Sequence, residues 1–185
     1  AQNAFANSSS SILQSKMNGN IVFLLLAPLS ALEVYLAFLG AAIARGLVTG
    51  GAVLLIASLI TPVTLHSALL VLLFALLSSG VMGALGIIAG IWSEKYDHLS
   101  AFQNFIILPL TFLSGVFYSI QDLPPFWRAV SSWNPVFYLI DGFRFGFLGV
   151  SDVSFGASVV VATLFLLLLT LLSIAILRSG YKLRG

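Results

Sequence analysis

Long apolar runs constrain this chain more than any other feature of its sequence. A helix needs about 20 residues to cross a bilayer. Four runs reach that length, at residues 32–60, 67–92, 101–120 and 155–177. Hydrophobic residues make up 59% of the chain and charged residues only 8%, which excludes an ordinary soluble domain. The sequence therefore predicts an all-α integral membrane protein with four transmembrane helices.

The segment 121–152, between the third and fourth runs, is rich in aromatic residues but broken by prolines. A Pro-Pro pair at 124–125 suits the first turn of a helix, where the missing N–H groups cost little. Asn134 is a good N-cap for a second helix that starts with proline and runs to about residue 148. Neither helix is long enough to span. We expect an external, re-entrant helix pair whose rings lie at the membrane interface.

Residues 1–31 precede the first run. Residues 1–12 are small, polar and serine-rich, which indicates a flexible terminus. The apolar stretch 21–26 is too short to cross a bilayer and predicts an interfacial or protein-docking helix. Because the chain lacks an initiator Met and a signal peptide, we expect it to be a fragment of a longer protein.

Small residues recur at four-residue spacing within the first two runs, and Pro109 is expected to kink the third. Such rows let helix backbones approach closely in lipid, where the hydrophobic effect no longer drives helices together. The rows consist of Ala42, Gly46 and Gly50 in the first run and Ser79, Gly83, Gly86 and Gly90 in the second.

Basic residues predict the orientation, because they concentrate on the cytoplasmic side of membrane proteins. Four spans place two of them, Arg128 and Arg144, on one side. The other side receives Lys16, Lys95, Arg178, Lys182 and Arg184. We therefore expect a cytoplasmic tail at 178–185 and a cytoplasmic loop at 93–100, with Ser93 and Ser131 accessible from opposite sides of the membrane.

Several chemistries are excluded by residues that the sequence lacks. There is no cysteine, hence no disulfide or thiolate metal site, and no GxxxxGK[ST] loop for nucleotide binding. A net charge of +2 without a basic stripe does not indicate nucleic-acid binding. No chain of acidic residues lies within the spans, so proton coupling is not indicated either. A pump of this composition needs an external source of energy.

The stretch LSGVFYSIQDLPPFWRAVSSWNPVFYLIDGFRFGFLG at 113–149 resembles the C-terminal signature of ABC-2-type permeases, the membrane subunits of one class of ABC exporters. Similarity continues through ARGLV at 44–48 and NIV…LLAPLS at 20–30. The NPVFY segment also fits the NPxxY pattern of heptahelical receptors, but nothing around it supports that family. The ABC-2 resemblance implies six spans, the first two of them upstream, with residues 1–12 as the cytoplasmic end of the second span. It also implies an assembly of two permease copies with two copies of a separate ABC ATPase subunit, which binds the ATP. This chain itself then needs no cofactor.

The resemblance also implies where the ATPase docks. In ABC-2 permeases the cytoplasmic connection before the first span of this chain touches the ATPase and couples its motion to the membrane. Relatives carry acidic residues where this chain has Val22 and Phe23, so we expect an apolar contact here. The expected coupling residues are Lys16, Asn20, Phe23, Leu25, Glu94 and Lys95.

Residues expected along the pathway include one charge within the first span. Arg45 lies about three turns inside it, where an unpaired guanidinium costs several kcal/mol. It either packs between helices or lines the route. Asp141 and Arg144 share a helix face and can pair. That pair either pins its helix or closes the exit, with aromatic rings as the seal. The expected gate residues are Phe117, Tyr118, Phe137, Tyr138, Asp141, Phe143 and Arg144.

These observations predict a homodimeric exporter permease in the inner (plasma) membrane, without catalytic activity of its own. The alternative is an energy-independent channel or assembly protein. The substrate class, whether drug, lipid or glycan, does not follow from the sequence.

Overall fold

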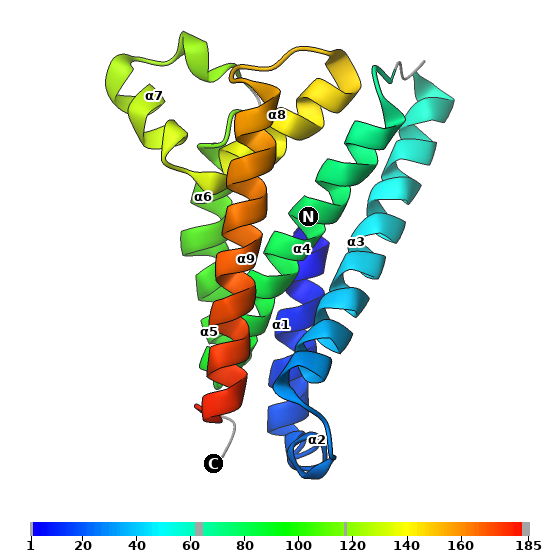
Figure 1. The fold of residues 1–185 in the computed structure, drawn as a ribbon, viewed down its shortest axis with the longest axis vertical. Coiled ribbons are helices and arrows are strands. Elements are labelled where there is room, and N and C mark those ends of the chain that lie inside the picture. Colours follow the sequence, from blue (N-terminus) through cyan, green and yellow to red (C-terminus); the bar gives the residue numbers. More distant parts are fainter. Residues whose placement is uncertain (1, 62–64, 117, 183–185) are drawn as a thin grey trace.

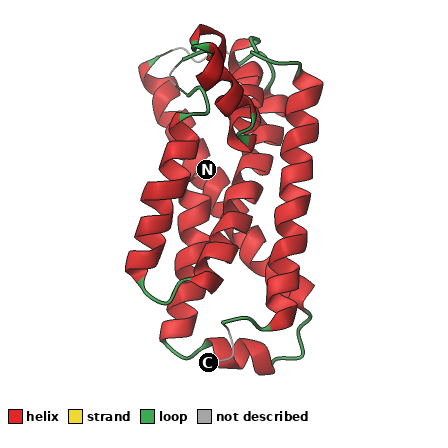
Figure 2. Cartoon of the chain, turned by 90° about the vertical axis from the view of Figure 1, so that its left-hand side faces the viewer, coloured by secondary structure: helices red, strands yellow, loops and turns green. Residues whose placement is uncertain are grey.

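The computed structural model describes residues 2–61, 65–116 and 118–182. Three of its helices are long and apolar enough to cross a membrane: α3 (Ala31–Ile60), α4 (Ala68–Trp92) and α9 (Phe155–Ser179). They run along the bundle in Figure 1, and Figure 2 shows the loops gathered at its two ends. No strand occurs in the described residues. The predicted all-helical membrane architecture is confirmed.

The serine-rich start of the chain forms α1 (Gln2–Met17), which lies against α4 inside the bundle in Figure 1. Phe5 and Leu13 are fully buried there. The serine hydroxyls donate to helix carbonyls, for example Ser9 Oγ to Phe5 O at 2.8 Å, so they are buried without an unpaired polar group. The flexible-terminus interpretation is therefore wrong for these residues. A short helix, α2 (Ile21–Leu26), follows at one end of the bundle.

The third predicted span is not one regular helix. It consists of α5 (Tyr96–Phe102), the π-helical turn η1 (Gln103–Ile107) and α6 (Leu108–Phe112). It therefore begins before residue 101 and ends well before 120, so the predicted bounds are wrong and a fourth unbroken span is not confirmed. The cause lies at Pro109, which has no N–H for the regular helical bond. The Leu108 N–H instead reaches five residues back to Gln103 O.

The segment after α6 forms a cap over the end of the bundle opposite α2 (Figure 1). It contains a 3₁₀ turn, η2 (Ile120–Asp122), and two helices, α7 (Pro125–Ser132) and α8 (Pro135–Leu148). The Asn134 side chain accepts from the Val136 N–H at 3.0 Å, as predicted for an N-cap. Its amide also donates to Leu110 O at 2.6 Å, which ties the start of α8 to α6.

The small-residue rows lie at close contacts between helices. A Cβ at Gly86 would lie 2.5 Å from Phe5 O of α1, and one at Gly90 would lie 2.8 Å from Ser9 O. Between α3 and α4, a Cβ at Gly83 would lie 3.0 Å from the Ala42 Cβ. Gly50 is the exception, because nothing lies within 4 Å of a Cβ built there. The rows therefore pack α1 and α3 onto α4, except at Gly50.

This packing predicts opposite effects for two Gly→Ala substitutions. Gly86→Ala should lower stability by about 1–3 kcal/mol, because a helix backbone must shift to accommodate the methyl group. Gly50→Ala, in open surroundings, should be neutral or stabilising by up to about 1 kcal/mol through helix propensity. Unfolding of each purified variant in detergent measures both effects. Equal stability of the two variants would contradict the close contact between α1 and α4.

Candidate functional site

Charged side chains gather at the two ends of the bundle. Lys16 and Lys182 both contact the carboxyl end of α4, whereas Arg144 lies on α8 at the opposite end. We call these the inner end, which carries α2, and the outer end, which carries α7 and α8. The predicted grouping of basic residues is present: Lys16, Lys95, Arg178 and Lys182 lie at the inner end and Arg128 and Arg144 at the outer. Arg184 lies outside the described residues.

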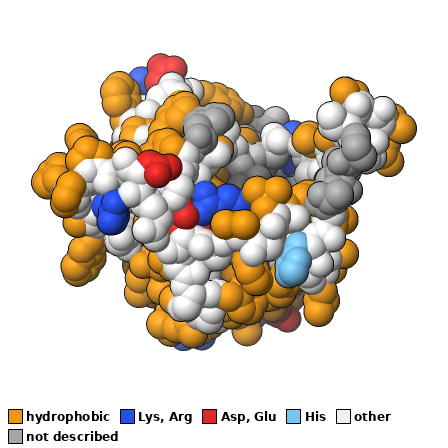
Figure 3. Space-filling model, turned by 90° about the horizontal axis from the view of Figure 1, so that it is seen from above, with side chains coloured by type: hydrophobic (Ala, Val, Ile, Leu, Met, Phe, Trp, Pro, Cys, Tyr) orange, Lys and Arg blue, Asp and Glu red, His pale blue; other side chains and the backbone are white. Residues whose placement is uncertain are grey.

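The outer end contains an ionic cluster centred on Arg144. Its Nη2 lies 3.2 Å from Asp141 Oδ1, the contact expected from their spacing on one helix. The same nitrogen lies 2.5 Å from Asp152 Oδ2, in the connection between α8 and α9. The Asp141 side chain is fully buried and that of Asp152 is 7% exposed. Seen from above, acidic and basic side chains lie beside one another among hydrophobic ones (Figure 3).

Hydrogen bonds from three segments complete this cluster, which we call the outer clasp: Ser119, Asp141, Arg144, Ser151, Asp152 and Ser158. Ser151 Oγ and Ser158 Oγ donate to Asp141 Oδ2 at 2.5 and 3.1 Å. The Asp152 N–H donates to Asp141 Oδ1 at 2.8 Å, and Ser119 Oγ donates to Asp152 Oδ1 at 2.7 Å. The clasp therefore ties α8, the start of α9 and the segment before α7 into one unit.

Burial alone would raise the pKa of Asp152, but its hydrogen bonds outweigh that effect. Donation from Arg144, from Ser119 and from the Ile120 N–H lowers the pKa below its usual value. Asp152 is therefore ionised at neutral pH, with both oxygens occupied. The clasp is suited to hold segments together rather than to relay protons.

The aromatic residues expected as a seal fall into separate contacts. Phe137 is buried against Tyr138 with ring centroids 5.1 Å apart, and the Tyr138 hydroxyl donates to Ser132 O. Phe143 instead packs on Phe147 at 5.0 Å, and both line an apolar groove between α3 and α4. The Tyr118 hydroxyl donates to Phe112 O, and Phe117 lies outside the described residues. A seal by these rings stays a prediction.

Arg45 has a partner within the chain. Its Nη1 donates to Asn7 Oδ1 of α1 at 3.0 Å, while the side chain remains exposed on the surface of α3. The acceptor is the carbonyl oxygen of a side-chain amide. This contact ties α3 to α1 and leaves both interpretations of Arg45 open.

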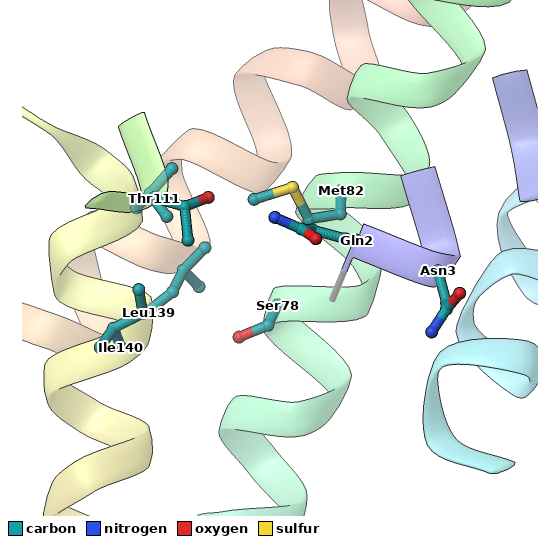
Figure 4. A pocket seen from close by; sticks show the side chains of 8 residues that line it. Gln2, Asn3, Ser78, Met82, Thr111, Leu139 and Ile140 are labelled. Atoms are coloured by element: carbon teal, nitrogen blue, oxygen red, sulfur yellow. The ribbon is translucent and has the colours of Figure 1, made fainter. Parts of the chain in front are cut away.

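A cavity of about 320 Å³ lies near the middle of the bundle, where α1, α4, α6 and α8 approach one another. Figure 4 shows the amide of Gln2 and the hydroxyls of Ser78 and Thr111 around it, beside Met82 and Leu139. It thus combines hydrogen-bonding groups with apolar side chains and has no charged residue in its lining. Sequence reasoning missed this cavity because its lining comes from four separate elements.

At the inner end, α2 exposes a row of apolar side chains. Val22 is 51% exposed, Phe23 is 74% and Leu26 is 77%. The side chain of Leu25 lies outside the described residues, and Asn20, at the start of α2, makes no capping bond with its side chain. The expected apolar docking segment is therefore uncovered within this chain.

The lysines and the acidic residue expected to couple to the ATPase differ in their surroundings. Lys16 Nζ donates to Ile91 O at 2.6 Å and Ser93 O at 2.7 Å, where a cation satisfies carbonyls at the end of α4. Lys95 is exposed. Glu94 pairs with Lys182 of the tail at 2.8 Å, and this hydrogen bond lowers the pKa of Glu94. The tail contact was not foreseen from sequence.

The clasp predicts a large difference between two arginines at the same end. Arg144→Met strands two buried carboxylates and should lower stability by roughly 3 kcal/mol, at the low end for a broken buried pair because Arg144 is 22% exposed. Within the described part of the chain, the exposed Arg128 guanidinium bonds only the carbonyls of Gln121 and Leu123, so Arg128→Met should cost less than about 1 kcal/mol. Thermal unfolding of the purified variants measures both.

Exchanging the charges, as Asp141→Arg with Arg144→Asp, should not restore this stability. An arginine at 141 would face the Asp152 N–H, which cannot accept a hydrogen bond, and the hydroxyls of Ser151 and Ser158 would lose the carboxylate oxygen to which they donate. Full recovery in the exchanged variant, or equal losses in the two single variants, would contradict the clasp.

Comparison with known proteins agrees with this architecture. The profile of a family described as "ABC-2 type transporter" matches residues 1–148. The inner membrane transport permease YadH of Escherichia coli is 36% identical over 183 residues, which cover 99% of this chain and 72% of that protein. Nodulation protein J of Rhizobium leguminosarum bv. viciae is 27% identical over 113 residues, 59% of this chain and 44% of that protein. No solved structure matches the chain.

Proposed function

The chain belongs to the ABC-2 type transporter family, and from this we propose that it is the permease subunit of an exporter driven by a separate ATPase subunit. The family and the apolar helices support a multi-pass inner-membrane permease of an ABC transporter, a transport component rather than an enzyme. The proposal adds that two copies of this chain form the pathway and that transport runs outward.

The exposed apolar face of α2 is the observation that carries the proposal. Val22, Phe23 and Leu26 leave large apolar surfaces uncovered at the end of the bundle, on a helix too short to span. Exposed apolar patches of this kind mark contacts with another protein or with a membrane surface. A cytoplasmic ATPase is the occupant that fits a permease whose own sequence carries no nucleotide-binding loop.

A continuous series of packed helices supports coupling from α2 to the outer end. α2 directly follows α1, which packs on α4 through the close contacts at Gly86 and Gly90. α4 in turn packs on α8, which carries Asp141 and Arg144 of the outer clasp. A displacement of α2 by ATP hydrolysis would move these elements together, and the cavity between them offers a site along the pathway.

The inner end is proposed to face the cytoplasm, together with the C-terminal tail. The positive-inside rule supports this orientation, because four described basic residues lie at the inner end and two at the outer. Ser93 and Ser131, expected from sequence to be accessible, are both fully buried, so neither can report the orientation. Ser131 is a buried residue of α7, and Ser93 is the C-cap residue of α4.

Exposed positions provide the topology test. The chain has no cysteine, so Lys95→Cys and Asp122→Cys each introduce a single thiol at an exposed site. An impermeant maleimide applied to intact cells should label the Asp122 variant and leave the Lys95 variant unlabelled until the membrane is opened. Labelling of Lys95→Cys alone in intact cells would invert the proposed orientation.

Docking of the ATPase predicts a difference between two exposed phenylalanines. Phe23→Asp on α2 should greatly reduce co-purification of the ATPase with the permease, because an apolar interface would then bury an unpaired carboxylate. Phe126→Asp is the matched control: Phe126 is 69% exposed but lies on α7 at the outer end. The measurement is the amount of ATPase recovered with each tagged permease, and the ATP hydrolysis of that complex.

Normal recovery of the ATPase with the Phe23→Asp variant would remove α2 as the docking segment. Transport by the purified permease without any ATPase would instead support the alternative of an energy-independent channel.

A further inference from the structure

An apolar groove opens at the inner end of the bundle, away from α2. It has a volume of about 330 Å³. Ile88 and Ile91 of α4 form its floor, while Phe102 and Ile106 line one wall and Ile176 of α9 the other. None of these side chains carries a polar group, so the groove suits a hydrocarbon chain rather than a polar solute.

The groove exists because its two walls do not meet. Both α9 and α5 pack against α4, yet among the described residues no Cα of α9 lies within 8 Å of one in α5, η1 or α6. The π-helical turn forms part of the far wall, where Phe105 is 80% exposed and Ile106 is 43% exposed. The described chain therefore leaves the groove open on the side that would face the bilayer.

The mouth of the groove has the chemistry of a membrane interface. Trp92 and Tyr181 line it and are 48% and 55% exposed, and rings of these two types concentrate at the level of lipid headgroups. Lys182 Nζ lies 5.6 Å from the centroid of the Trp92 ring, so an ammonium group lies at the mouth of the groove.

The local charge favours an anionic headgroup. Lys182 pairs with Glu94, an exposed carboxylate, and Lys16 interacts electrostatically with both. Two cations therefore share one nearby anion at this mouth. The phosphate of a lipid can offset this excess positive charge while an acyl chain of the same lipid fills the groove.

We propose that this groove binds one anionic phospholipid, with an acyl chain between α9 and η1 and the phosphate beside Lys182. The proposal requires only that the chain lies in a bilayer, and it is independent of the transported substrate and of the ATPase. Headgroup selectivity is expected to come from Lys182, since one lysine near a membrane surface contributes about 1 kcal/mol towards an anionic lipid.

Trp92 is itself a reporter for the test. Full-length protein carrying Trp127→Phe and Trp133→Phe keeps Trp92 as the one tryptophan of this chain. It is reconstituted into phosphatidylcholine vesicles with increasing fractions of brominated phosphatidylglycerol or brominated phosphatidylcholine, both of which quench nearby tryptophan fluorescence. Half-maximal quenching should need about fivefold less brominated phosphatidylglycerol than phosphatidylcholine, the factor that about 1 kcal/mol provides.

Three lysine substitutions make the result specific. Lys182→Gln should abolish the preference for phosphatidylglycerol, whereas Lys95→Gln, which removes the same charge at the same end from an exposed site, should retain it. Lys182→Arg should also retain it, which separates lost charge from a disordered tail. Equal quenching by both lipids, or equal losses in both Gln variants, overturns the proposal. Absence of quenching by either lipid overturns it too, because protein then covers the groove.

Discussion

The close contact between α1 and α4 is the interaction on which the rest of the structure depends. Lipid is as apolar as leucine, so helices in a bilayer associate through close packing rather than through the hydrophobic effect. Glycines 86 and 90 of α4 bring the α1 backbone to a distance that admits no methyl group. α4 also packs against α3, α8 and α9, so the same helix organises both the membrane-crossing elements and the outer cap.

The charged groups of the described residues, apart from Arg45, lie near the two ends of the bundle, and each end has a different character. At the outer end, Arg144 pairs through one nitrogen with two buried carboxylates, and these contacts hold α8 against the start of α9. At the inner end, the charged groups lie near the surface and α2 exposes apolar side chains. A bonded outer end and an uncovered inner face suit the proposed permease, which a partner would drive from its inner end. A central cavity lined by amide and hydroxyl groups lies between them.

Local patterns in the sequence predicted the elements whose causes are local. The apolar run predicted α3 to within one residue, and Asn134-Pro135 predicted the start of α8. The Asp141–Arg144 contact followed from helix spacing, but Asp152 joins it from beyond the helix and required the tertiary fold. The burial of α1 was missed because its serines look solvent-exposed in sequence, although their hydroxyls bond to carbonyls within the helix. The π turn before Pro109 likewise depends on how the helix absorbs a missing hydrogen bond.

The central claim is that ATP hydrolysis by a partner at the inner end changes the outer end of this chain. Spin labels at Ile60→Cys and Asp122→Cys, both exposed and on different outer segments, report that change by pulsed electron paramagnetic resonance without knowledge of the substrate. The account predicts that the distance distribution shifts when the assembled transporter is trapped with ATP and vanadate. It also predicts no shift with ATP when the ATPase is absent or has lost its nucleotide-binding lysine. An unchanged distribution with an active ATPase, or the same shift without one, would contradict the account.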